Sequence, residues 1–179
     1  MKPRFAAPDV LTALRLPLAV LFPLAHAPVW QFAILAVAAA SDVLDGFLAR
    51  RLGGSRAGAI LDPIADKVFV ASAFLTVWRR GLLEGYELAG VLLRDIVAVV
   101  AFIGTWMLRR PVALPARAGG KAVTIAQLLT LAAAVADSPL VRPLAWATAA
   151  IAVYAIWDYG RAAGRAGRAG RAGRARRAS

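Results

Sequence analysis

The sequence predicts an all-α integral membrane protein with six transmembrane helices, on the strength of three observations. Hydrophobic residues fill 60% of the 179 positions, well above the roughly 45–50% of a soluble domain. They form runs close to the roughly 20 residues that a helix needs to cross a bilayer. Basic residues collect in every second connection between those runs, as the positive-inside rule requires.

The runs follow one another through short connections that contain proline, glycine or both. The first run ends at His26-Ala27-Pro28, the second before Gly53-Gly54-Ser55 and the third before Gly81. The fourth ends before Arg109-Arg110-Pro111, and the fifth, the shortest, ends at Asp137-Ser138-Pro139. The expected helices span residues 9–26, 29–50, 58–79, 86–108, 119–137 and 139–160.

The basic residues orient these helices, and we expect both termini in the cytoplasm. In that orientation Arg79, Arg80 and Arg142 face the opposite side of the membrane. The cytoplasmic set is much larger: Lys2, Arg4, Arg50, Arg51, Arg56, Arg109, Arg110, Arg117, Lys121 and the tail arginines. The protein is then expected in the inner or plasma membrane, with the link at 50–58 on the cytoplasmic side.

Residues 1–160 are expected to form one membrane domain, and 161–179 a disordered basic tail. The tail repeats Gly-Arg-Ala and holds seven arginines, a low-complexity composition. Two interpretations stay open: a solvated positive-inside tail, or a tether to anionic lipid head groups at about 1 kcal/mol for each well-placed arginine. Membrane lipids and phosphorylated substrates, and not nucleic acid, are the expected partners of the net charge of +12.

Four of the ten acidic residues lie between positions 42 and 66, with apolar runs on both sides. An aspartate near the centre of a spanning helix costs roughly 2.5 to 3.5 kcal/mol, so these carboxylates need a cation or a polar cavity. Asp42 and Asp45 are three positions apart and Asp62 and Asp66 are four apart, so each pair shares a helix face. The short link between the helices makes an antiparallel hairpin that can bring both faces together. We therefore expect an active site at the cytoplasmic ends of the second and third helices.

Four converging carboxylates are suited to divalent cations. The chain has no cysteine and one histidine, His26, so a bound metal would use oxygen ligands or that histidine. Oxygen ligands favour Mg²⁺, Mn²⁺ or Ca²⁺. Two such ions could bridge a pyrophosphate and stabilise an in-line displacement at phosphorus.

Small residues lie beside the first carboxylate pair. Gly46 and Ala49 leave the helix surface bare, so that a flat ligand could approach the backbone, and Arg50 offers a planar donor fork for phosphate. Taken alone, the same pattern also fits a close helix-packing seam.

Together these residues resemble the signature of the CDP-alcohol phosphatidyltransferase family, D-x-x-D-G-x-x-A-R followed by a spacer and G-x-x-x-D-x-x-x-D. All eight signature residues are present: Asp42, Asp45, Gly46, Ala49, Arg50, Gly58, Asp62 and Asp66. The spacer between Arg50 and Gly58 is shorter than is usual in the family.

The resemblance implies a homodimer of six-helix subunits that transfers a phosphatidyl group from CDP-diacylglycerol to an alcohol and releases cytidine monophosphate (CMP). It implies two divalent ions, Mg²⁺ or Mn²⁺, held by Asp42, Asp45, Asp62 and Asp66. It also implies that Asp66 removes the proton from the acceptor hydroxyl. The nucleotide-binding residues would be Asp45, Gly46, Ala49, Arg50 and Gly58.

Shorter matches resemble the phosphatidylglycerophosphate synthases and the related cardiolipin synthases. They are the segments Pro8 to Arg15, with Asp9 in place of asparagine, Leu61 to Lys67, and Gly120 to Gln127. Arg94-Asp95 departs from the Arg-Glu of the glycerophosphate enzymes and is closer to the cardiolipin-synthase-like branch. We expect glycerol 3-phosphate as acceptor, with phosphatidylglycerol or an inositol-type polyol as alternatives.

A phosphorylated acceptor needs cationic ligands. Arg117 and Lys121 could clamp its phosphate or could be ordinary flanking charges. Arg94, about midway along its helix, needs a partner inside the membrane, either a carboxylate such as Asp95 or a substrate phosphate. Lys67 is expected to orient the substrate or to offset the acidic cluster.

A divalent-cation transporter is the alternative from a different class. Its carboxylates would be distributed along a path through the bilayer. Such a path gives no reason for Gly46, Ala49 and Arg50 at fixed spacing, so the sequence favours the transferase. For Thr12 and Arg15, on the first helix, a structural and a substrate-binding role are both open.

Overall fold

Six helices make up the described part of the chain, and no strand occurs in it. This computed structural model describes residues 7–52, 58–107 and 118–178, and within these ranges the side chains of some residues, Asp62 among them, are not described. The helices are α1 (Ala7–Leu24), α2 (Pro28–Leu52), α3 (Gly58–Arg79), α4 (Gly85–Met107), α5 (Ala118–Val135) and α6 (Val141–Ala178). The expected helices are confirmed, and the first five agree with their expected bounds to within two residues.

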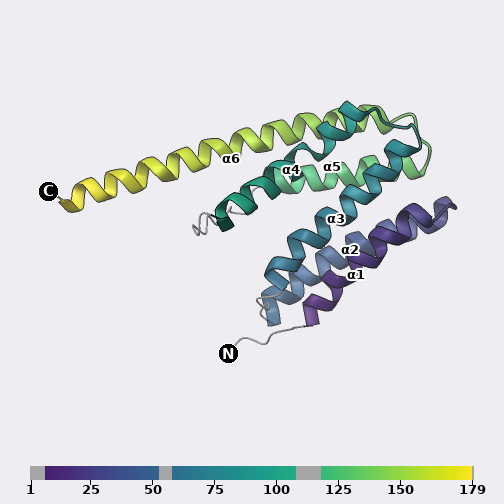
Figure 1. Cartoon of the computed structure of the whole chain (residues 1–179), viewed down its shortest axis with the longest axis horizontal. Coiled ribbons are helices and arrows are strands. Elements are labelled where there is room, and N and C mark those ends of the chain that lie inside the picture. The colour runs from purple at the N-terminus through teal and green to yellow at the C-terminus, as the bar shows by residue number, and fades with distance from the viewer. Residues whose placement is uncertain (1–6, 53–57, 108–117, 179) are drawn as a thin grey trace.

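Three short connections, at 25–27, 80–84 and 136–140, gather at one end of the molecule (Figure 1). Two of them begin with the same kind of helix cap. At the end of α3, Leu82 N–H donates to Val77 O at 3.3 Å and Gly81, with φ 73°, donates to Trp78 O at 2.9 Å. This is a Schellman motif, which needs a left-handed residue where glycine is least strained.

The end of α5 has the matching arrangement. Ser138 N–H donates to Ala133 O at 2.9 Å and Asp137 N–H to Ala134 O at 3.3 Å, with Asp137 at φ 48°. The Asp137 carboxylate also binds Arg80 Nη2 at 2.7 Å, so the two capped turns are tied to each other. These contacts fix the ends of α3 and α5 side by side.

The helices pack as two groups of three (Figure 1). In one group α1 packs against both α2 and α3, and in the other α6 packs against both α4 and α5. The groups meet less extensively, through α2 with α5 and through α3 with α4 and α5. One apolar core nevertheless continues through both, from Phe22 and Phe69, whose rings meet edge to face at 6.1 Å, to Leu131.

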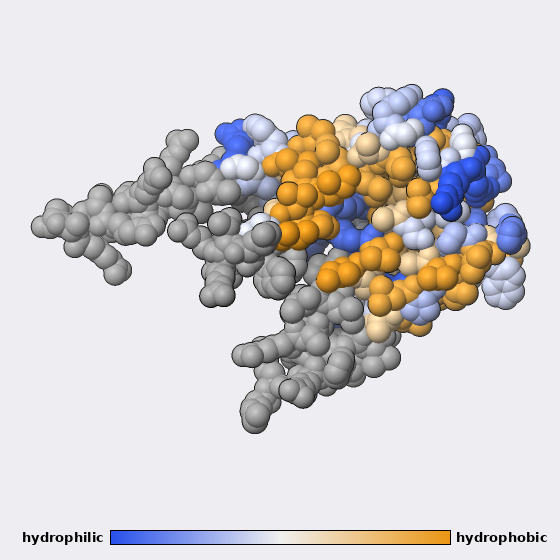
Figure 2. Space-filling model, viewed as in Figure 1, coloured by the Kyte–Doolittle hydropathy of each residue, from blue (hydrophilic) through white to orange (hydrophobic). Residues whose placement is uncertain are grey.

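Apolar side chains also cover a large part of the surface in view (Figure 2). Val20, Trp30 and Val100 are among the exposed large apolar side chains of the described residues. By length and composition, Pro28–Asp45 is the one segment of the described residues that could cross a membrane, and Thr12–Leu24 and Gly119–Val135 are shorter apolar segments. Charged residues inside α3 and α4 interrupt their apolar runs. These findings are consistent with a membrane protein, while the six spans and their orientation stay predictions.

The tail differs from what the sequence led us to expect. We expected disorder at 161–179, but α6 continues to Ala178 without a break. Alanine and arginine are both strong helix formers, and the preceding apolar part of α6 supplies a nucleus from which the helix can extend. Low complexity therefore did not decide the local conformation.

Candidate active site

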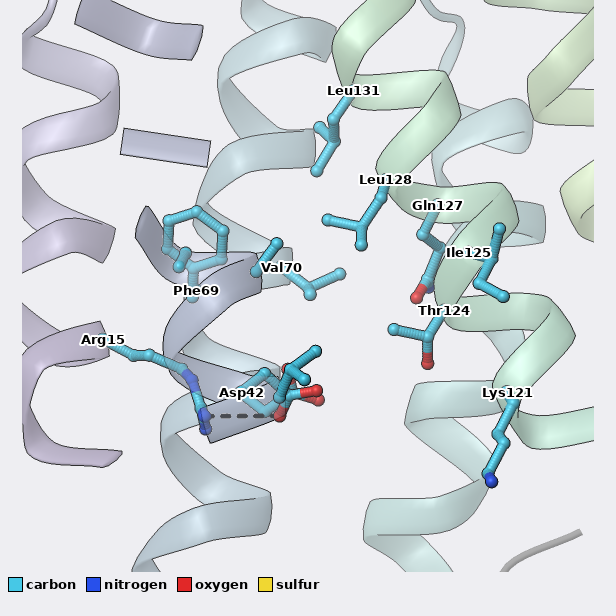
Figure 3. A pocket seen from close by; sticks show the side chains of 14 residues that line it. Arg15, Asp42, Phe69, Val70, Lys121, Thr124, Ile125, Gln127, Leu128 and Leu131 are labelled. Atoms are coloured by element: carbon cyan, nitrogen blue, oxygen red, sulfur yellow. Dashed lines mark ion pairs between the residues drawn. The ribbon is translucent and has the colours of Figure 1, made fainter. Parts of the chain in front are cut away.

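A cavity of about 370 Å³ lies between the two helix groups. Residues from α1, α2, α3 and α5 line it. Its apolar part is formed by Ala38, Ala39, Val43, Phe69, Val70, Ile125, Leu128 and Leu131. Charged side chains lie toward its other end, where Figure 3 shows Arg15 and Lys121 on opposite sides of Asp42. The cavity thus has an apolar lining at one end and charged side chains, which could bind ionic groups, at the other.

Asp42 and Asp45 share one helix face, as expected, and both meet Arg15. The Arg15 Nη2 atom lies 3.3 Å from Asp42 Oδ1 and also pairs with Asp45 Oδ2, which accepts a hydrogen bond from Thr12 Oγ1 at 3.2 Å. Arg15 and Asp45 are almost fully buried, whereas about half of the Asp42 side chain is exposed. A buried carboxylate needs such partners, so Thr12 and Arg15 set the direction of this pair.

Asp66 lines the same cavity from α3. About a third of its side chain is exposed, and its Oδ2 atom lies 3.9 Å from the ammonium of its neighbour Lys67. Two of the four expected carboxylates, Asp42 and Asp66, thus reach one cavity from two helices. Asp62 belongs to the same face of α3 by its spacing, but its side chain lies outside the described set.

A second charged cluster is centred on Asp95 of α4 and is linked to Asp66 through Lys67. Asp95 Oδ1 pairs with Lys67 and accepts a hydrogen bond from Arg94 Nη1 at 3.0 Å. Its other oxygen accepts one from Gln127 Nε2 at 2.6 Å. Asp95 is buried, and its partners come from three helices. Arg94 thus pairs with Asp95, and Lys67 lies between Asp66 and Asp95. Their roles in binding the acceptor stay predictions.

The start of α5 touches Arg94 closely. A Cβ atom added at Gly120 would lie 2.8 Å from Arg94 Nη2 and 2.9 Å from the Tyr159 hydroxyl. The backbone can approach these groups because glycine has no side chain there. Tyr159 could not be singled out from the sequence, because the packing of α6 on α5 brings it to this point.

Lys121 lines the cavity from α5 and is exposed, a position open to a ligand. Arg117 lies outside the described residues. Gly46, Ala49 and Arg50 lie in the last turns of α2, and Gly58 is the first residue of α3, but the surroundings of these four are outside the described set as well. Their nucleotide-binding role stays a prediction.

Comparison with known proteins decides the family. A model of the CDP-alcohol phosphatidyltransferase family matches residues 5–157. The chain belongs to this family. The match covers all of α1 to α5 and the first part of α6, and it therefore includes every residue that lines the cavity described above. Family membership decides against the cation-transporter alternative.

Individual relatives are similar over most of the chain. A protein of Salmonella paratyphi A named CDP-diacylglycerol--glycerol-3-phosphate 3-phosphatidyltransferase is 36% identical over 140 residues, which is 72% of this chain and 76% of its own. A protein of Escherichia coli K12 with the same name is also 36% identical, with the same coverage. A probable phosphatidylglycerophosphate synthase of Mycobacterium tuberculosis is 35% identical over 133 residues, covering 69% of this chain and 62% of its own.

Members of this family generally use divalent metal ions. Asp42 and Asp66 fit such a group, because they bring hard oxygen ligands to one cavity from facing helices. Among the side chains that the structure describes, however, no three carboxylates gather in one place. Arg15 occupies the neighbourhood of Asp42 and Asp45, and Asp62 is outside the described set. The complete four-carboxylate site therefore stays a prediction.

Proposed function

We propose that the protein transfers the phosphatidyl group of CDP-diacylglycerol to the primary hydroxyl of glycerol 3-phosphate, giving phosphatidylglycerophosphate and CMP. The family fixes the reaction type, and the relatives named above suggest the acceptor. The structural observation that carries the proposal is the single cavity in which Asp42 and Asp66 meet cationic residues at one end and an apolar wall at the other.

Two divalent ions, Mg²⁺ or Mn²⁺, would be held by Asp42, Asp45, Asp62 and Asp66. When bound, they would neutralise the pyrophosphate of the donor and stabilise the charge that develops on the transferred phosphorus group. Arg15 would keep Asp42 and Asp45 directed to one side of α2, since it already binds both.

Asp66 would accept the proton of the acceptor hydroxyl. The hydroxyl oxygen then forms a bond to the phosphatidyl phosphorus, and the bond from that phosphorus to the CMP oxygen breaks. CMP leaves with the electron pair of the broken bond, so no oxidant or further reactant is needed. General-base help of this kind contributes about 10²- to 10⁴-fold.

The acceptor phosphate would be bound by Lys121, with Arg117 and Arg94 as further cationic candidates. Lys121 is the best placed of the described ones because it lines the cavity from the side opposite Arg15 (Figure 3). Gly46, Ala49, Arg50 and Gly58 would receive the cytidine nucleotide, together with Asp45. The enzyme would act as a homodimer with the site facing the cytoplasm.

A panel of acceptors tests this proposal. Purified protein in lipid would be given CDP-diacylglycerol, Mg²⁺ and, in turn, glycerol 3-phosphate, phosphatidylglycerol or inositol phosphate, and CMP release would be measured. We expect CMP release with glycerol 3-phosphate to be at least about tenfold faster than with the others. A cation that binds the acceptor phosphate favours the acceptor whose phosphate and reacting hydroxyl have the matching separation. Faster release with phosphatidylglycerol would move the protein to the cardiolipin-synthase-like branch.

A further inference from the structure

Asp95 pairs with two cationic side chains and one amide close to the cavity, yet it does not line the cavity itself. It accepts from Lys67, Arg94 and Gln127, which belong to three different helices. Gln127 also donates to Val91 O at 3.0 Å, so the amide is fixed against the backbone of α4. The position of the Asp95 carboxylate is therefore set within the group of α4, α5 and α6, and its contact with Lys67 of α3 crosses the boundary to the other group.

Lys67 lies between two carboxylates. Its ammonium is in direct contact with Asp95 Oδ1, while Asp66 Oδ2 is 3.9 Å away. A lysine ammonium is a mobile point charge on a flexible stem. In a poorly hydrated interior such a charge pairs with whichever carboxylate is in reach, because an unpaired charge there is very unfavourable. Without the Asp95 charge, the remaining carboxylate within reach among the described side chains is Asp66.

We propose that Asp95 is a positioning residue that draws the Lys67 ammonium away from the cavity and so leaves Asp66 open to the cation and the acceptor hydroxyl. The inference rests on the function proposed for Asp66. It assigns Lys67 no contact with the acceptor, and it explains why a carboxylate outside the cavity is held by three donors.

Three variants test the proposal: Asp95→Asn, Lys67→Met and the double variant. The readout is binding of Mn²⁺ alone to the purified full-length protein, followed by the electron paramagnetic resonance signal of free Mn²⁺. Asp95→Asn should weaken Mn²⁺ binding at least about tenfold, because the Lys67 ammonium then pairs with the Asp66 carboxylate and competes with the metal. Losses of this size are found when groups that orient metal ligands are removed. The double variant should regain most of the loss, because the competing ammonium is gone.

Two outcomes would overturn the proposal. One is that Asp95→Asn binds Mn²⁺ as the parent does; the other is that the double variant binds as weakly as Asp95→Asn. If Asp95→Asn does not fold, Lys67→Met decides alone. It should bind Mn²⁺ at least as tightly as the parent, and a loss of tenfold or more would show that Lys67 supports the site directly.

Kinetics separate positioning from acceptor binding. Asp95→Asn should lower kcat while the KM for glycerol 3-phosphate changes little, and a raised KM with unchanged kcat would contradict the proposal. Asp137→Asn is the matched control, since it removes a paired carboxylate at the far end of the molecule and asparagine tolerates the left-handed backbone there. If the parent releases no CMP with any acceptor, the proposed function fails, while the Mn²⁺ measurements still judge the role of Asp95.

Discussion

Asp66 is the residue on which the chemistry depends most directly. Asp66→Asn keeps the shape of the side chain but removes its capacity to accept a proton, so kcat should fall about 10²- to 10⁴-fold. CMP release at saturating substrates measures the loss, and Asp137→Asn should retain parental kcat. An Asp66→Asn variant with parental kcat would refute the general-base role.

Gly120 offers a second test at this scale. Gly120→Ala places a methyl group within 3 Å of both Arg94 and Tyr159, so the Arg94 guanidinium must shift from its place against α5. If Arg94 takes part in binding the acceptor, the KM for glycerol 3-phosphate should rise about threefold to tenfold, the loss of part of one charged hydrogen bond. The KM for CDP-diacylglycerol should not change.

Gly104→Ala is the control for that substitution. Nothing lies within 4 Å of the added methyl group, and alanine is the better helix former by up to about 1 kcal/mol. It should leave both KM values as they are, and an equal rise in this variant would mean that the Gly120 effect is not local.

The roles of individual residues could be predicted from the sequence only in part. Asp42 and Asp45 were expected on one helix face because their spacing on one helix defines it, and Arg15 confirms this by touching both. Asp95 was considered as a partner of its neighbour Arg94, and the two do pair. However, the contact of Arg15 with Asp45 and that of Asp95 with Lys67 were not predictable. Each of these two contacts joins residues about 30 positions apart, and helical periodicity carries no information about contacts between helices.

The connection end of the bundle gives a prediction about helices rather than about chemistry. Glu87, near the start of α4, is buried and accepts hydrogen bonds from Arg142 Nε at 3.2 Å, Trp146 Nε1 at 3.1 Å and Glu84 N–H at 2.8 Å. Glu87→Ala would leave these donors unpaired, which should lower the free energy of unfolding by about 1–3 kcal/mol. Thermal unfolding in detergent measures this, with kcat of the folded protein unchanged.

Glu84→Ala provides the comparison. The Glu84 carboxylate is exposed and lies 3.5 Å from Arg142, a surface pair worth at most about 1 kcal/mol. A loss as large as that of Glu87→Ala would contradict the view that the buried Glu87 carboxylate, and not the surface pair, stabilises this end of the bundle.

The helices themselves were predictable because long apolar runs and proline–glycine punctuation are local signals. The Schellman caps at Gly81 and Asp137 agree with the connections expected there. The continuation of α6 to Ala178 was not expected, since the Gly-Arg-Ala repeat had been interpreted by its composition and not by the helix propensity of two of its three residues.

The topology of the whole molecule can be tested with single cysteines, because the chain has none. Ser138→Cys lies in the connection between α5 and α6, while Ser55→Cys and Ser179→Cys lie in the link after α2 and at the C-terminus. In intact cells stripped of any outer wall, a membrane-impermeant maleimide should label Ser138→Cys alone. The other two should react only after the membrane is opened, and the parent should not react.

The reverse labelling pattern would place the carboxylate cavity on the non-cytoplasmic side. Labelling of all three variants in intact cells would contradict a membrane-spanning bundle of these helices. The sequence predicts the orientation from the positions of arginine and lysine, a signal that the fold alone does not carry.

We propose that the phosphatidyl group is joined to glycerol 3-phosphate in one cavity, which Asp42 and Asp66 line. The most direct test is the transfer of label from radioactive glycerol 3-phosphate into solvent-extractable lipid by the purified protein with CDP-diacylglycerol and Mg²⁺. We expect one labelled lipid for each CMP released, and about 10²- to 10⁴-fold slower labelling by Asp66→Asn. CMP release without labelled lipid, or no release at all from the folded protein, would contradict the account.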